Sequence, residues 1–230
     1  MSIALVVAGL SVCGSIPLHV VQTSRTGDPG PYRESWRRCY GNVRHTCFSD
    51  GQVYDEIRST RWRRVWSRLT GVQQADVFRY FYLYHHGGIY ADTDVTCLRA
   101  LPSTILSQYR LIVGLESFIT DDKLAAWVQM IPGGQYVQWT IAAAPRHPAL
   151  KDVLDSIYAS VPARPDHSIP FTLNFSGPYA WTRAVRRHLL APDVLVLPQV
   201  SFACNGYSSP PCGGDSYIQH HWAGSWRVGL

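Results

Sequence analysis

The chain has 230 residues, of which 46% are hydrophobic, and a formal net charge of +5 at neutral pH. This length and apolar content suffice for a sizeable core and one domain, and they exclude a chain that is disordered over long stretches. The positive charge comes almost entirely from arginine, because Lys123 and Lys151 are the only lysines. The planar guanidinium group of arginine suits phosphate and carboxylate ligands.

The apolar stretch 3–13 bears on the cell compartment. It is too short to span a bilayer, and it lacks the basic flank of a complete signal peptide. The stretch fits either the remnant of an anchor or a first buried segment, so we expect a soluble chain without a stable membrane span. The compartment stays open between the Golgi or secretory lumen, if an anchor has been removed, and the cytoplasm.

Six cysteines occur at irregular spacing and without a CxxC pair, which argues against a zinc module. Cys204 and Cys212 flank the turn-rich segment NGYSSPP. A disulfide between them is one interpretation, and free buried thiols are the other.

The first half of the chain predicts a strand and two helices before a second strand. Residues 16–21 are apolar and predict a buried strand, followed by the turn-rich segment TGDPGP. Segment 61–69, RWRRVWSRL, has apolar residues at helical spacing with arginines mostly around the other side, which predicts an amphipathic basic helix. A helix over 73–86 is ended by Gly87 and Gly88 and runs into a short strand at 89–92.

The second half continues this alternation. The segments 111–116 (LIVGLE) and 137–144 (VQWTIAAA) predict strands, as does VLVL at 194–197. One helix follows His147, and Pro178 opens another that extends to about Leu190. Alternating strands and helices predict an α/β fold with a mixed, mostly parallel sheet flanked by helices, with ligands beyond the carboxyl ends of the strands.

Asp92 and Asp94 lie at such a strand end. Being two residues apart, their side chains leave an extended backbone on the same side, about 6 to 7 Å apart. Carboxylates this close repel each other unless a cation is near, and Mg²⁺ or Mn²⁺ takes oxygen ligands while leaving sites for substrate phosphates. The alternative is a solvated turn, in which two aspartates around a threonine are frequent.

Residues near this pair extend the candidate site. Asp76 and Arg79 are three apart on the predicted helix and therefore share a face, where they either hold ribose or sugar hydroxyls or form an ordinary surface ion pair. Tyr90 shares a strand face with Asp92, which places it beside a nucleotide or in the core.

The run ADVFRYFYLYHHGGIYADTDVTCLRAL resembles the DxD sugar-binding region of glycosyltransferase family 32, with its alanine-aspartate pair, arginine-tyrosine, GGxY turn and DxD. IPLHVVQT looks like the first strand of that family, SW at Ser35 and Trp36 resembles its early motif, and HHWAGSW resembles its closing motif. VQWTIAAAPRHPAL and FSGPYAWTRAV look like segments of the fungal initiation-type α-1,6-mannosyltransferases within the family. The resemblance covers nearly the whole chain.

The resemblance implies a single GT-A domain over residues 1–230, a nucleotide-sugar donor, Mn²⁺ with Mg²⁺ as the alternative, and retention of anomeric configuration. The implied reaction moves a hexose to a glycan or another hydroxyl acceptor. GDP-mannose is the favoured donor, while UDP-galactose, UDP-glucose and UDP-N-acetylglucosamine remain open. No nucleic-acid partner is expected.

Carried over by position, the resemblance assigns Asp92 to the ribose or sugar and Asp94 to the metal. The other implied donor-site residues are Gln22, Thr23, Asp76, Arg79, Tyr90, Ser225 and Trp226. His220 fits the second metal ligand better than His221, because Trp222 then takes the aromatic place two residues on. A neutral imidazole ligand favours Mn²⁺ over Mg²⁺.

Retention leaves two routes. A double displacement needs a carboxylate on the far face of the sugar, and Glu116, Asp121 and Asp122 are the mid-chain acids that fit. A front-face route, in which the leaving phosphate accepts the acceptor's proton, needs no protein nucleophile and is the one that the resemblance favours.

Two hypotheses of other classes compete. The segment RWRRVWSRL interleaves arginines with tryptophans, which is typical of nucleic-acid or anionic-surface binding. A catalytically silent protein of the same fold is the second alternative. The substitution Asp94→Asn separates the glycosyltransferase hypothesis from the nucleic-acid hypothesis. The first predicts that the variant loses metal-dependent nucleotide binding, and the second predicts that salt-sensitive nucleic-acid binding survives.

Overall fold

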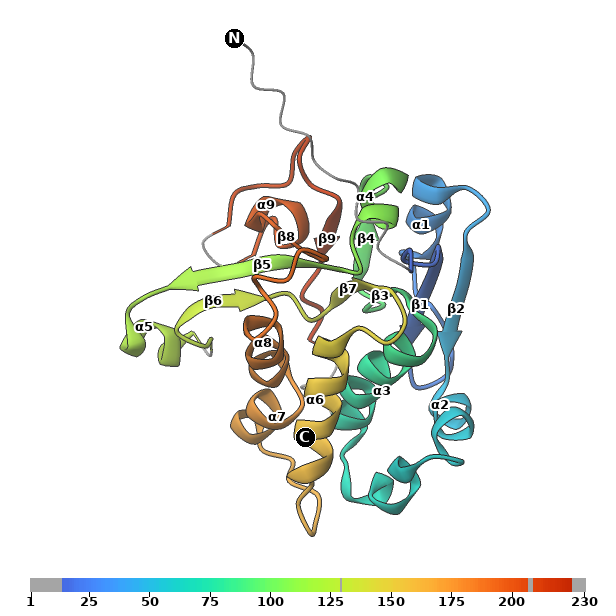
Figure 1. Cartoon of the computed structure of the whole chain (residues 1–230), viewed down its shortest axis with the longest axis vertical. Helices are drawn as coiled ribbons and strands as arrows, with labels where there is room; N and C mark the ends of the chain where they lie inside the picture. Colours follow the sequence, from blue (N-terminus) through green and yellow to red (C-terminus); the bar gives the residue numbers. More distant parts are fainter. Residues whose placement is uncertain (1–13, 129, 207–208, 225–230) are drawn as a thin grey trace.

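The computed structural model describes residues 14–128, 130–206 and 209–224 (Figure 1). Its strands are β1 (His19–Thr23), β2 (Arg44–Phe48), β3 (Gly88–Ala91), β4 (Val95–Cys97), β5 (Leu111–Ile119), β6 (Gly133–Tyr136), β7 (Thr140–Ala143), β8 (Val194–Leu197) and β9 (Ile218–His220). Within these ranges, a seven-stranded sheet has the order β2-β1-β3-β7-β5-β6, with β8 also paired with β5. Strands β4 and β9 form a separate two-stranded sheet.

The large sheet is mixed. Strand β1 is parallel to β2 and β3, and β8 is parallel to β5. Strand β7 is antiparallel to both β3 and β5, and β6 is antiparallel to β5. The predicted α/β class is confirmed, and the carboxyl ends of β1 and β3 meet at one edge of the sheet, where Asp92 follows directly.

Helices cover both faces of the sheet. They are α1 (Arg33–Tyr40), α2 (Asp50–Ile57), α3 (Gly71–His86), α4 (Ser103–Gln108), α5 (Asp122–Trp127), α6 (Pro148–Ala159), α7 (Ile169–Phe175), α8 (Pro178–Arg186) and α9 (Gln199–Phe202). Figure 1 shows α3, α6, α7 and α8 on one face and α1, α4, α9 and the β4–β9 pair on the other. Neighbouring residues of a strand point to opposite faces, so Val21 and Tyr90 join one hydrophobic cluster while Val20 and Ile89 join the other.

Helix α3 passes directly into β3, as the GGIY segment predicts. A capping box between Thr70 and Gln73 begins the helix. Gly87 and Gly88 end it with φ values of 69° and 117°, which L side chains rarely adopt. A Cβ atom on Gly88 would lie 2.7 Å from the carbonyl oxygen of His19, so the backbones of β1 and β3 require glycine there.

Some predicted boundaries are wrong. Segment 61–69 forms two 3₁₀ turns, Arg61–Arg64 and Trp66–Arg68, instead of one α-helix. Apolar residues three apart stack on one side of a 3₁₀ turn, which has three residues per turn, and the short segment ends where Thr70 caps α3. The expected strand 137–144 pairs only as β7, and helix α8 ends at Arg186 rather than near Leu190.

The described chain contains two disulfides. Cys204 pairs with Cys212, as one of the two interpretations predicts, and Cys39 pairs with Cys97.

No helix within the described ranges is both long and apolar enough to cross a bilayer. The apolar stretch 3–13 and the candidate residues Ser225 and Trp226 lie outside the described residues.

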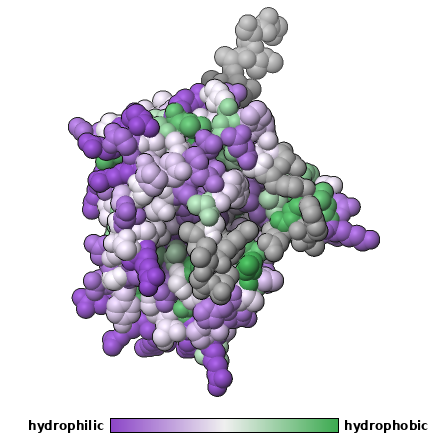
Figure 2. Space-filling model, turned by 180° about the vertical axis from the view of Figure 1, so that it is seen from behind, coloured by the Kyte–Doolittle hydropathy of each residue, from purple (hydrophilic) through white to green (hydrophobic). Residues whose placement is uncertain are grey.

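Strands β5 and β6 project from the sheet together with α5. Seen from behind in Figure 2, this arm lies at the right and carries hydrophobic side chains at its surface. Phe118 is 68% exposed and Leu124 is 40% exposed. Glu116 lies at the base of the same arm and is only 7% exposed.

Candidate active site

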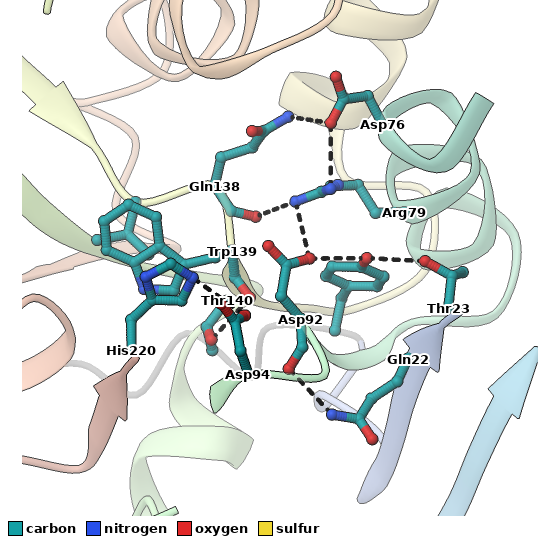
Figure 3. A network of polar contacts seen from close by, with 12 residues as sticks. Gln22, Thr23, Asp76, Arg79, Asp92, Asp94, Gln138, Trp139, Thr140 and His220 are labelled. Atoms are coloured by element: carbon teal, nitrogen blue, oxygen red, sulfur yellow. Dashed lines mark hydrogen bonds and ion pairs between the residues drawn. The ribbon is translucent and has the colours of Figure 1, made fainter. Parts of the chain in front are cut away.

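Asp92, Asp94 and His220 form a cluster at the end of β3. The chain leaves β3 at Ala91 and turns through the two aspartates into β4, whose Val95 is opposite His220 in the β4–β9 ladder. One ligand atom from each of the three side chains lies within 4.8 Å of the others. His220 Nε2 is 3.2 Å from Oδ1 of Asp94. Pairing of the two short strands thus brings a histidine from the end of the chain to the DxD motif (Figure 3).

The segment after β9 encloses Asp94. The backbone N–H of His221 donates to the Asp94 carbonyl oxygen at 2.9 Å, and that of Ala223 donates to Oδ2 at 2.9 Å. Burial alone would raise the pKa of Asp94, but the hydrogen bonds from His220 and Ala223 and the charge of the imidazole lower it overall. The carboxylate therefore stays ionised over a wide pH range.

His221 is directed elsewhere. Its ring stacks on Tyr32 with 4.1 Å between ring centroids, and its Nε2 lies 2.7 Å from the hydroxyl of Thr96. The structure thus places His220, and not His221, beside the two aspartates.

A buried arginine joins the helix to the DxD motif. Arg79 of α3 lies 3.1 Å from Asp76 and 3.3 Å from Oδ1 of Asp92, and it donates to the carbonyl oxygen of Gln138 at 3.1 Å (Figure 3). Burial disfavours the charged guanidinium, but Asp92, Tyr90 and Asp76 together raise the pKa of Arg79. The pair is therefore no ordinary surface ion pair.

Asp76 is held on its other side as well. Its Oδ1 accepts a hydrogen bond from Gln138 at 2.9 Å, and its Oδ2 accepts one from the Ser176 hydroxyl at 2.8 Å. Gln138 also donates to the Tyr80 hydroxyl at 2.7 Å. This network fixes the carboxylate and the guanidinium before any ligand binds.

The two residues predicted at the end of the first strand have different places. Thr23 and Tyr90 share a hydrogen bond of 3.1 Å, and Tyr90 donates to Oδ1 of Asp92 at 3.0 Å. Gln22 is fully buried and donates to the backbone carbonyl of Asp92 at 3.0 Å. Thr23 and Tyr90 line the cavity described next, whereas Gln22 supports the backbone of Asp92 from within the sheet.

The cluster opens into a cavity of about 800 Å³. Its polar lining includes Thr23, Asp76, Arg79, Asp92, Asp94, Glu116, Gln135 and His220. Trp139 and Trp222 contribute aromatic surface, and the Trp139 ring stacks on His220 with 4.7 Å between centroids. Gln138 and Trp139 were not predicted as site residues, because in sequence they are indistinguishable from the buried positions of a strand. A volume of this size suits a small-molecule or cofactor site.

Residues 31–112, which contain the DxD motif, match the family described as "Glycosyltransferase sugar-binding region containing DXD motif". Over these residues the chain is similar to members of this glycosyltransferase family. It is 30% identical to the initiation-specific alpha-1,6-mannosyltransferase of Schizosaccharomyces pombe, over 92% of this chain and 64% of the relative. It is also 26% identical to inositol phosphoceramide mannosyltransferase 1 of the same organism, over 68% of this chain and 42% of that protein.

The chain thus spans 64% and 42% of the length of these two relatives. A solved structure, the PaToxG glycosyltransferase, superposes with a TM-score of 0.50 and 12% identity, over 76% of this chain and 71% of that one. The likeness supports the fold, which is of the GT-A type as the resemblance implies.

Of the three mid-chain acids Glu116, Asp121 and Asp122, Glu116 lines the cavity. Burial raises the pKa of Glu116 to about 7. Asp121 and Asp122 are exposed at the start of α5, away from the residues that line the cavity. Glu116 is therefore the acid among the three that can meet a ligand in this cavity.

The basic segment 61–69 presents no aromatic platform. Trp62 and Trp66 are 2% and 7% exposed, and both belong to the core. Their burial leaves neither ring available for base stacking. Arg61 is paired with Asp155 of α6.

Proposed function

We propose that this chain transfers a hexose from a nucleotide-diphosphate sugar to a hydroxyl acceptor, with mannose from GDP-mannose as the first candidate. The observation that carries the proposal is the joining of Asp92, Asp94 and His220 beside the buried Asp76–Arg79 pair, in one cavity. Both relatives are named as mannosyltransferases, which supports mannose as the transferred sugar. The UDP-sugars remain the alternative donors.

The side chains of Asp92, Asp94 and His220 form a set of ligands that fits a divalent metal ion. Two carboxylates and one imidazole supply oxygen and nitrogen ligands, a combination that Mn²⁺ accepts more readily than Mg²⁺. The Nδ1 atom of His220 is buried and has no hydrogen-bond partner among the described residues, so no protein group already occupies this nitrogen. Asp94 and His220 would hold the ion with help from Asp92. When bound, such an ion neutralises negative charge that develops on a leaving diphosphate.

The protein's own residues orient the donor. The Arg79 guanidinium is charged and fixed by two carboxylates, and it can hold hydroxyls of the ribose or the sugar together with Asp76. Trp139 and Trp222 bound the cavity beside His220 and shield the diphosphate from water. We favour the front-face route, in which the leaving phosphate accepts the acceptor's proton while the new glycosidic bond forms on the same face.

A panel of nucleotide-sugars tests the proposal. Each is incubated with the protein and Mn²⁺, and the released nucleoside diphosphate is measured with and without EDTA. We expect release from one sugar nucleotide, GDP-mannose first, and its loss on chelation and in Asp94→Asn.

The matched control is Asp55→Asn, which changes an exposed aspartate paired with Arg58 on the surface. It should keep the wild-type rate. A wild-type protein that releases no nucleoside diphosphate from any sugar nucleotide, and whose melting temperature does not change with Mn²⁺ and GDP or UDP, would refute the proposed function.

A further inference from the structure

Glu116 occupies an irregular position in the sheet. In the β5–β6 ladder, Leu115 is opposite Tyr136 and Ser117 is opposite the next residue, Gln135. Two steps along β5 therefore match one step along β6, and Glu116 is the extra residue of a β-bulge. A bulge changes the direction of a side chain that regular alternation would place on the other face. At Glu116 it directs the carboxyl group into the cavity.

The carboxyl group of Glu116 is only partly satisfied by the protein. Its side chain is hydrogen-bonded to Gln135, while its Oε2 is buried and has no hydrogen-bond partner among the described residues. The backbone carbonyl of Glu116 accepts from Gln199 at 2.7 Å, which holds the bulge in place. Leaving a buried polar atom unpaired is costly, so an oxygen of this kind facing a cavity points to a ligand that completes it.

The position of Glu116 relative to Asp92 indicates which part of a ligand it meets. Strand β7 lies between β3 and β5, so the two residues are separated by two strand spacings, roughly 10 Å. Both line the same cavity. If the diphosphate is held at Asp94 and His220, a hexose that extends through the cavity towards β5 meets Glu116.

We propose that Glu116 binds a hydroxyl group of the transferred hexose through its Oε2 atom, and that it does not serve as a covalent nucleophile. This inference rests on the proposed function. A sugar hydroxyl both donates and accepts hydrogen bonds, so it pairs with the ionised and the neutral carboxyl group alike. Burial raises the pKa of Glu116 to about 7, and the front-face route favoured above needs no protein nucleophile, so holding a sugar hydroxyl is the role that remains for this carboxyl group.

Binding measurements separate the sugar from the nucleotide. Calorimetric titration with Mn²⁺ compares GDP with GDP-mannose, and in parallel UDP with UDP-glucose, for the wild type and for Glu116→Leu. We expect Glu116→Leu to bind the nucleoside diphosphate as the wild type does and the sugar nucleotide roughly tenfold to a hundredfold more weakly. The control Glu34→Gln changes an exposed glutamate and should leave both affinities unchanged.

The variant Glu116→Gln distinguishes a hydroxyl-binding group from a nucleophile. Its amide keeps the shape and the hydrogen-bonding capacity of the side chain, so we expect less than about a tenfold loss of kcat/KM. A loss of a thousandfold or more with unchanged affinity for the sugar nucleotide would identify Glu116 as a nucleophile and overturn the inference.

The remaining outcomes also decide. If Glu116→Leu binds the sugar nucleotide, relative to the nucleoside diphosphate, as tightly as the wild type does, the role of Glu116 is overturned while the proposed function stands. A wild-type protein that binds none of the four nucleotides in the presence of Mn²⁺ overturns both.

Discussion

The Oδ1 atom of Asp94 lies 3.2 Å from Nε2 of His220, although the two residues belong to opposite halves of the chain. The β4–β9 ladder places Val95 opposite His220, and the backbone N–H of His221 donates to the Asp94 carbonyl oxygen. Three backbone and side-chain contacts thus fix one carboxylate against one imidazole before a ligand is present. The pairing of the carboxylate with the imidazole is therefore a property of the folded chain.

Substitution of either residue should therefore abolish metal-dependent nucleotide binding. We expect the wild type to gain several degrees in melting temperature when Mn²⁺ and GDP or UDP are added together, because a ligand that binds only the folded state stabilises it. Asp94→Asn and His220→Ala should lose this gain, and His221→Ala should keep it. Differential scanning fluorimetry measures all three, and a full gain in His220→Ala would contradict the assignment of His220.

Arg79→Lys should lower the free energy of unfolding much more than a conservative exchange of one basic residue for another usually does. The guanidinium contacts Asp76, Asp92 and the carbonyl oxygen of Gln138 at once, and a lysine ammonium cannot reproduce this planar arrangement. Breaking a buried ion pair typically costs about 3–5 kcal/mol, so we expect a loss of about 2–4 kcal/mol for the lysine variant, which keeps the charge.

Urea denaturation measures this loss. The matched control is Arg37→Lys, which changes an exposed arginine paired with Glu34 and should alter the free energy of unfolding by less than about 0.5 kcal/mol. Equal effects of the two substitutions would show that the Arg79 network is not stabilising.

Much of this site could be predicted from local sequence, because its parts are local. The i, i+3 spacing of Asp76 and Arg79, the glycine turn and the two aspartates all lie in one helix–strand unit, whose geometry follows from short-range rules. The assignment of His220 came from the resemblance, since no local rule connects β9 to β4.

Other parts depend on tertiary contacts that spacing does not encode. The bulge at Glu116 exists because β5 pairs with β6, and the buried position of Gln22 depends on its hydrogen bond to Asp92. Segment 61–69 was wrongly predicted as an α-helix, since periods of 3.0 and 3.6 residues cannot be separated over so short a stretch. The pairing of Cys97 with Cys39 could not be chosen from the sequence either.

Removal of the two disulfides should have unequal effects. The Cys39–Cys97 bridge closes a sequence separation of 58 residues and holds the end of β4, whereas Cys204–Cys212 closes only 8. The loop-entropy relation gives stabilisation of about 4 kcal/mol for the longer loop and about 2.5 kcal/mol for the shorter one. Both disulfides lie close to the β4–β9 pair. Cys97 is the last residue of β4, and the backbone of Cys204 forms an isolated β-bridge with Gln219 of β9.

Paired serine variants test this ranking. Urea denaturation of Cys39→Ser with Cys97→Ser should show the larger loss of stability, and its melting-temperature gain with Mn²⁺ and nucleotide should fall as well. The reverse order of the two losses would show that the closed loop length is not what decides the stabilisation.

The stability of the ligand-free protein should depend on pH through Glu116. Burial raises the pKa of this carboxyl group from 4.5 to about 7, so the folded state binds its proton more tightly than the unfolded state does. Below pH 4.5 both states are protonated and Glu116 imposes no electrostatic cost. The cost develops as the pH rises from 4.5 to 7 and is complete above 7, where it amounts to a few kcal/mol, on the order of 3.

Glu116→Gln removes this titration and leaves the other groups of the chain in place. Its free energy of unfolding, measured by urea denaturation without metal or nucleotide, should therefore exceed that of the wild type by more at pH 8 than at pH 5. Because the comparison is between two chains that differ at one position, titrations elsewhere cancel to a first approximation. A difference that is the same at both pH values would mean that Glu116 ionises in the folded protein as freely as in the unfolded chain, and the unpaired oxygen would then be solvated rather than reserved for a ligand.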